Sequence, residues 1–100
     1  MIFPTYQNKE VEVPKSVQYE LTELGLMLSE VVYILENGFD CSRSKRKKDV
    51  IEKCMRFGNK VVKVVAQKKF RLSGKEFWRI RHAGIMGMRR EWVKSVGYGA

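Results

Sequence analysis

The spacing of apolar residues changes once along this 100-residue chain, and that change limits the possible folds more than any other feature. Between residues 16 and 37 apolar side chains recur every three or four positions, which is the spacing of helices that bury one face. Gly25 and Gly38 follow the two apolar stretches, as glycine often does at the end of a helix. From about residue 50 the spacing becomes two, as in half-buried strands. The sequence therefore predicts an α+β domain built from two layers.

The expected elements follow from this change of spacing. Helices are predicted at 16–24 and 28–37, and strands at about 50–57, 60–67 and 76–85, with turns at Gly58-Asn59 and Ser73-Gly74. Val11 and Val13 alternate with glutamates and indicate one more short strand. We expect an N-terminal helical hairpin, packed on a three- to four-stranded antiparallel meander sheet, within a single domain of residues 1–100. Its predicted parts are the hairpin at about 15–38, a basic loop at 40–49, the sheet at about 50–86 and a short C-terminal helix at about 87–96.

Charge is distributed unevenly between the two parts of the chain. Residues 1–40 hold two basic and seven acidic side chains, a net charge of −5, whereas residues 41–100 hold 18 basic and four acidic side chains, a net charge of +14. Such asymmetry points to a polyanion as the partner of the second part, because neutralising phosphates releases counterions. The alternative is a cationic surface that only keeps the protein in solution.

Several other classes of protein find no support in the sequence. Charged residues interrupt every apolar stretch before the ~20 residues that a spanning helix needs, and the N-terminus does not resemble a signal peptide. One histidine and two cysteines thirteen positions apart cannot form a Cys/His zinc set. No glycine-rich phosphate loop is present. We therefore expect no membrane, metal or cofactor partner, and a cytoplasmic protein in which Cys41 and Cys54 are free thiols.

Part of the chain resembles a family of small microbial proteins of unknown function. The family pattern is a helix, then a second helix with the signature R-G-I-S/T-x-E/D-x-V-x-x-h-L-x-x-G, then a basic meander sheet. Residues 25–31 (GLMLSEV) and 34–38 (ILENG) resemble that signature, and residues 60–65 (KVVKVV) and 78–82 (WRIRH) resemble the later strands. The likeness extends from about residue 13 to 85. The first-helix histidine and arginines of the family are replaced here by Ser16, Glu20 and Leu24.

This family is similar to the RelE and BrnT toxins, and the likeness implies a fold and an activity. It implies a RelE-like arrangement in which a pair of helices lies on a sheet. It also implies endoribonuclease activity within a toxin–antitoxin pair, and hence an antitoxin as protein partner. Because the polar residues of the family's first helix are absent, the likeness implies no catalytic group on that helix.

The candidate site residues lie in the basic part of the chain. Cleavage through the RNA 2′-hydroxyl needs a proton-transfer group and positive charge beside the phosphate, which Arg79, Arg81 and His82 would supply as catalytic residues. The alternative for His82 is a partly buried side chain held by a hydrogen bond. Residues predicted to bind nucleic acid are Arg43, Lys45, Arg46, Lys47, Lys48, Lys53 and Arg56. Aromatic residues that could stack on bases, or else belong to the core, are Phe70, Phe77, Trp78 and Trp92.

Three functions are compatible with these residues. The first is a protein that binds RNA or another nucleic acid through its sheet face and basic loop, without catalysis. The second is a RelE- or BrnT-like endoribonuclease. The third is an interaction module whose acidic hairpin and basic sheet associate with those of another copy. The sequence favours the first, because the first helix lacks the polar residues that the toxin-like family carries.

Overall fold

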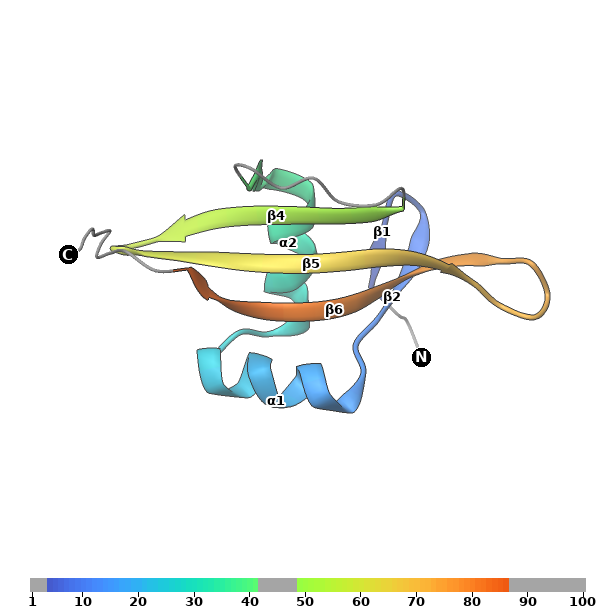
Figure 1. Ribbon diagram of the computed structural model, residues 1–100, viewed down its shortest axis with the longest axis horizontal. Helices are drawn as coiled ribbons and strands as arrows, with labels where there is room; N and C mark the ends of the chain where they lie inside the picture. Colours follow the sequence, from blue (N-terminus) through green and yellow to red (C-terminus); the bar gives the residue numbers. More distant parts are fainter. Residues whose placement is uncertain (1–3, 42–48, 87–100) are drawn as a thin grey trace.

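A computed structural model describes residues 4–41 and 49–86 of the chain (Figure 1). Two short strands come first, followed by two helices, one short strand and three longer strands. Their bounds are β1 Thr5–Tyr6, β2 Lys9–Glu12, α1 Lys15–Leu24, α2 Leu28–Asn37, β3 Phe39–Asp40, β4 Val50–Phe57, β5 Lys60–Phe70 and β6 Glu76–Met86. The predicted C-terminal helix at 87–96 and most of the predicted basic loop at 40–49 lie outside the described residues.

The predicted sheet was wrong in size and topology. All six strands form one curled mixed sheet in the order β1-β2-β6-β5-β4-β3, in place of the expected meander of three or four antiparallel strands. The strands from β4 to β6 do form an antiparallel meander, but β2 runs parallel to β6, with Val11 opposite Trp78. Parallel neighbours need a long crossover connection, and here both helices and strands β3 to β5 lie between β2 and β6. No local spacing encodes such a pairing.

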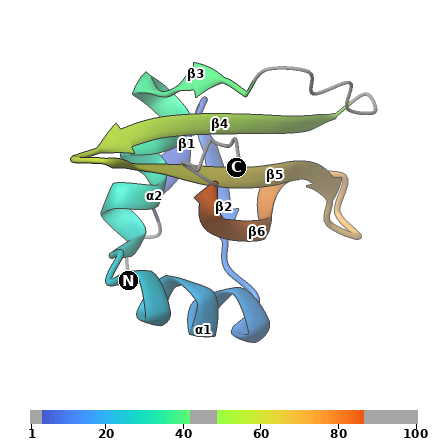
Figure 2. The ribbon, with the colours of Figure 1, turned by 60° about the vertical axis from the view of Figure 1, so that its left-hand side comes forward.

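The two helices were predicted at the right residues but in the wrong arrangement. Gly25 ends α1 in the left-handed region at φ 71°, and the Glu30 carboxylate accepts a hydrogen bond from the Met27 N–H at the start of α2. The helices do not pack as a hairpin on the sheet, because each contacts a different part of it (Figure 2). Helix α2 lies against β1, β4 and β5, whereas α1 lies along β6.

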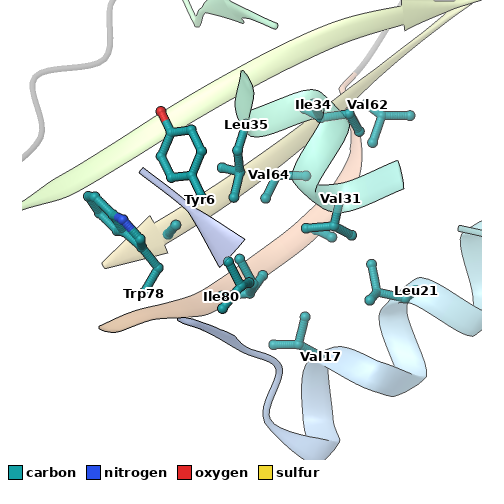
Figure 3. Close-up of a cluster of buried hydrophobic side chains, with 13 residues drawn as sticks. Tyr6, Val17, Leu21, Val31, Ile34, Leu35, Val62, Val64, Trp78 and Ile80 are labelled. Carbon is teal, nitrogen blue, oxygen red and sulfur yellow. The ribbon is translucent and has the colours of Figure 1, made fainter. Parts of the chain in front are cut away.

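The core lies between the helices and one face of the sheet, which we call the inner face (Figure 3). Val31, Ile34 and Leu35 of α2 are essentially inaccessible to solvent, and so are Val64 and Ile80 of the sheet. Tyr6, Val11, Val17, Leu21, Val62, Ala66, Trp78 and Ala83 complete this core cluster. The inner face therefore carries the alternate residues of β4, β5 and β6 that pack on the helices. The remaining residues of these strands form the outer face.

A β-bulge in the middle of β6 breaks the alternation between the two faces. Val65 pairs with His82 and Ala66 with Ile80, so Arg81 is the extra residue on β6. The strict alternation that we expected would have placed His82 on the same side as Trp78 and Ile80. The bulge instead makes His82 half exposed and puts Ala83 on the inner face, where it is buried.

The prediction of free thiols was also wrong, because Cys41 and Cys54 form a disulfide. Their Cα atoms lie 5.6 Å apart, and strand β3 pairs with β4 directly beside the bond, with Phe39 opposite Cys54. Cys54 is fully buried. The bond therefore fastens the end of β3 to the centre of β4.

Candidate nucleic-acid interface

Four basic side chains of the outer face have no carboxylate partner within the described part of the chain. They are Arg56 on β4, Lys63 and Lys69 on β5 and Arg81 on β6. The strand register puts three of them on one face: Arg56 pairs with Val61, Lys63 lies between Cys54 and Gly84, and Lys69 pairs with Phe77. Arg81 donates a hydrogen bond to the side-chain oxygen of Gln67, a neutral outer-face residue. The outer face therefore presents four basic side chains that form no ion pair with a described carboxylate, and it also carries the carboxylate of Glu52, opposite Val65.

Three lysines at inner-face positions are paired with carboxylates, whereas Lys60, at the exposed end of β5, is paired with no described carboxylate. Lys53 Nζ lies 2.6 Å from Asp40, and Lys9 lies 3.5 Å from Glu76. Lys68 contacts both Asp49 and Glu76, at 3.6 and 3.5 Å. The predicted pair of Lys53 and Arg56 is therefore divided between the two faces, since these residues are three positions apart on one strand. Only Arg56 remains with the outer-face cations.

A compact cluster occupies the outer face where β2 meets β6. The Arg71 guanidinium lies over the Phe77 ring, 3.9 Å from its centroid, and the Arg79 guanidinium lies 5.5 Å from the same ring. Glu12 accepts a hydrogen bond from Arg79 Nε at 2.7 Å and lies 3.7 Å from Arg71. Phe77 is only 4% exposed. Arg79 is thus committed to an ion pair and a ring contact that join β6 to β2, and less of its charge is available to a phosphate.

The other two predicted catalytic residues lie next to each other at the bulge. His82 Nδ1 lies 3.3 Å from the Glu20 carboxylate of α1, and the same carboxylate accepts a hydrogen bond from the Ala83 N–H at 2.9 Å. Beyond Arg79, β6 has no neighbouring strand on this side among the described residues, so Glu20 satisfies a backbone donor of an exposed edge. This contact agrees with the alternative of a partly buried, hydrogen-bonded histidine, since the His82 side chain is half exposed, and it leaves the catalytic role untested.

The predicted residues are only partly brought together. Arg81 and His82 share the bulge, Arg79 lies in the cluster at β2, and Arg56 lies near the far end of β4. Arg43, Lys45, Arg46, Lys47 and Lys48 lie outside the described residues. Phe77 and Trp78 belong to packed clusters, as weighed, but on opposite faces.

The sequence reasoning missed two of the four outer-face cations, Lys63 and Lys69. The alternation of β5 could have identified both lysines. Every second residue of this strand lies on the outer face, namely Val61, Lys63, Val65, Gln67 and Lys69. The prediction used the net charge of the basic run before β4 and did not use the position of each lysine along β5.

Comparisons with known proteins identify no relative: no family model, curated protein or solved structure matches the chain. Within residues 4–41 and 49–86, no group of three or more His, Cys, Asp or Glu side chains could hold a metal ion. In the same residues no helix has the length and apolar character needed to cross a membrane.

Proposed function

We propose that this protein binds RNA through the outer face of its sheet. The observation that carries the proposal is the gathering of Arg56, Lys63, Lys69 and Arg81 on this face without a carboxylate partner, while the inner-facing Lys9, Lys53 and Lys68 are paired. Long basic side chains on a sheet face can follow a phosphate backbone without reading its sequence. The net charge of +14 in residues 41–100 adds long-range attraction for a polyanion.

The outer face suits a single strand better than a rigid duplex, because the sheet is curled and its cations lie on three neighbouring strands. Lys63 and Lys69 stand on either side of the buried Val65 along β5, and Arg81 of β6 contacts Gln67 between Val65 and Lys69. Single strands are flexible enough to follow such an arrangement, and their binding depends strongly on salt.

The salt dependence of binding tests this proposal. In the double variant Lys63→Gln/Lys69→Gln we expect at least about tenfold weaker binding of a labelled single-stranded RNA at low salt. Each lost phosphate contact lowers the slope of log K against log salt by about 0.7, so the slope should fall by roughly 1.4. Fluorescence anisotropy over a series of salt concentrations measures both quantities.

The matched control is Lys15→Gln/Lys60→Gln, which removes the same charge from exposed lysines that lie elsewhere. We expect this control to retain the parent slope. Equal losses in the two variants would show that only net charge matters and would remove the outer face from the proposal. A matched DNA strand, measured in the same series, shows whether the 2′-hydroxyl contributes to affinity.

An endoribonuclease is the second candidate, and the bulge is the observation that favours it. The bulge puts Arg81 and His82 side by side, and Glu20 lies within 3.3 Å of the imidazole. A histidine oriented by a carboxylate beside a guanidinium is an arrangement that can accept the 2′-hydroxyl proton and stabilise the phosphate. Bulges also occur more often than average next to active sites.

Product analysis tests the endoribonuclease candidate. If it is correct, the parent protein converts RNA to fragments that end in 2′,3′-cyclic phosphate, and His82→Ala and Arg81→Ala each lower the rate at least 100-fold, in line with the usual contribution of acid–base catalysis. Gln67→Ala, which removes only the neutral partner of Arg81, serves as the control and should cut at close to the parent rate. Intact RNA after prolonged incubation with the parent protein would eliminate this candidate.

A protein that binds RNA would act in the cytoplasm, and we keep this expected location as part of the proposal. Thiols in that compartment are mostly reduced. The fold must therefore persist when the Cys41–Cys54 bond is open, a requirement that can be measured.

A further inference from the structure

The imidazole of His82 has a defined position on the outer face, where the residue pairs with Val65. Its Nδ1 lies 3.3 Å from the Glu20 carboxylate of α1, the helix that lies along β6 (Figure 1). On the opposite side of the ring, Nε2 lies 2.9 Å from the point that a Cβ atom would occupy on Gly84. The missing side chain of Gly84 therefore provides the space in which the ring lies over the outer face.

Glu20 also determines which nitrogen of the ring can donate a hydrogen bond to the outer face. Its carboxylate accepts a hydrogen bond from the Ala83 N–H at 2.9 Å and is thereby held beside His82. Because an ionised carboxylate only accepts, it favours a hydrogen on Nδ1, which leaves Nε2 of the neutral ring as an acceptor. In the protonated ring both nitrogens donate. Nε2 can therefore donate to a phosphate oxygen only after the ring takes up a proton.

Two of the unpaired outer-face cations lie within reach of a phosphate placed over Gly84. Lys63 is the β5 partner of Gly84, and the Cβ positions of such cross-strand partners are about 5 Å apart. Arg81 precedes His82 at the bulge and contacts Gln67 on the outer face. An anion over Gly84 would therefore meet the Lys63 ammonium and Nε2 of His82, with the Arg81 guanidinium close by.

We infer that His82 and Lys63 together bind one backbone phosphate of the RNA over Gly84, and that His82 does so in its protonated form. The inference rests on the proposed function and adds to it a phosphate site whose occupation takes up a proton. Binding of RNA and protonation of the ring then favour each other, as linkage between two ligands of one site requires.

Both signs of charge surround the ring. The charged groups that face it are Glu20 of α1, Lys63 of β5, Arg81 of β6 and, in the same row of the sheet beyond Val65, Glu52 of β4. Glu20 stabilises the protonated ring directly, whereas the two cations repel it. A phosphate placed among these cations offsets their repulsion, so the protonated ring is favoured most when RNA is bound.

The composition of the chain makes this proton uptake measurable. The sequence holds one histidine, and histidine is the side chain whose ordinary charge change falls between pH 5 and 8. A hydrogen bond to a charged group commonly changes affinity about tenfold or more. We therefore expect the parent protein to bind a labelled single-stranded RNA about tenfold more tightly at pH 5.5 than at pH 7.5. The additional phosphate contact should also make the slope of log K against log salt steeper by about 0.7 at the lower pH.

Three variants, measured by fluorescence anisotropy at both pH values, connect this response to the ring. His82→Gln should bind RNA with the same affinity at pH 5.5 and pH 7.5. The matched control His82→Gln/Tyr33→His moves the one histidine to an exposed position of α2, the helix that packs on the inner face. We expect less than a twofold response to pH in this control.

Gly84→Ala tests the position of the ring while the histidine stays in place. The three atoms nearest to the added methyl group all belong to the His82 ring, which can rotate away, and Gly84 has no positive φ that alanine would oppose. We therefore expect this variant to fold, as circular dichroism would show, and its response to pH to fall below about threefold.

The outcomes separate this inference from the proposed function. If the parent binds RNA at neither pH, both proposals fall. If it binds with the expected dependence on salt but equally well at both pH values, only this inference falls. A tenfold response that persists in His82→Gln, in the relocated histidine or in Gly84→Ala would likewise overturn it, because the proton would then be taken up elsewhere or the ring would not need its place over Gly84.

Discussion

The substitution Gly38→Ala should lower the free energy of unfolding by about 3 kcal/mol, at the upper end of what an added methyl group costs in a packed site. A Cβ atom at this position would lie 2.6 Å from the carbonyl oxygens of both Cys54 and Ile34. Both oxygens belong to backbone, one on β4 and the other on α2, so no rotation of a side chain can relieve the contact. The methyl group must therefore push α2 and β3 away from β4. Denaturation by urea, followed by circular dichroism, measures the change.

The backbone conformation of Gly38 makes this substitution informative. Its φ of −72° is available to alanine, so the expected loss comes from the close approach alone. Gly25→Ala is the matched control, since Gly25 lies at φ 71° with open space around its Cβ position. There we expect a loss of about 1 kcal/mol, from the left-handed conformation only. A Gly38→Ala variant that is no less stable than Gly25→Ala would show that the gap between α2 and β4 can widen at little cost.

Local features of this fold could be predicted from the sequence, because their signals lie within a few residues. The spacing of apolar residues and the two glycines located both helices, and Ser73-Gly74 located the turn between β5 and β6. The contact between β2 and β6 could not be predicted, since it joins Val11 to Trp78 across most of the chain. Pairing of that kind depends on how the whole sheet curls, and many registers satisfy the same short alternation.

The candidate site was also predicted only as far as local spacing of residues could indicate it. Alternation correctly divides β5 into an inner and an outer face, and the missed cations Lys63 and Lys69 could have been found by extending the count along that strand. The same alternation fails on β6, because the extra residue Arg81 moves every later side chain of that strand to the opposite face. A bulge has no distinct signature among the residues of this strand. The meeting of His82 with Glu20 is equally hidden, because α1 reaches the edge of β6 only in the folded chain.

Reduction of the Cys41–Cys54 disulfide should lower the free energy of unfolding by about 3 kcal/mol while the protein remains folded. The two cysteines are thirteen residues apart, and closing a loop of this size restricts the unfolded chain by about that amount. Urea denaturation of the oxidised protein, compared with protein kept in a phosphine reductant, measures the difference. The slope of unfolding free energy against urea should increase on reduction, because the unfolded chain without its cross-link exposes more surface.

The control for this measurement is the double variant Cys41→Ala/Cys54→Ala, whose stability should not respond to the reductant. An identical unfolding midpoint for oxidised and reduced parent would contradict the prediction.

RNA affinity supplies a second readout, since the outer-face cations are positioned by the pairing of β4, β5 and β6 rather than by the bond. We expect that affinity to change less than twofold on reduction. We expect the reduced protein to stay folded because its core cluster, which includes Val31, Ile34, Leu35, Val64 and Ile80, contains neither cysteine. A protein that unfolds on reduction would instead require an oxidising compartment, and the cytoplasmic part of the proposed function would then be wrong.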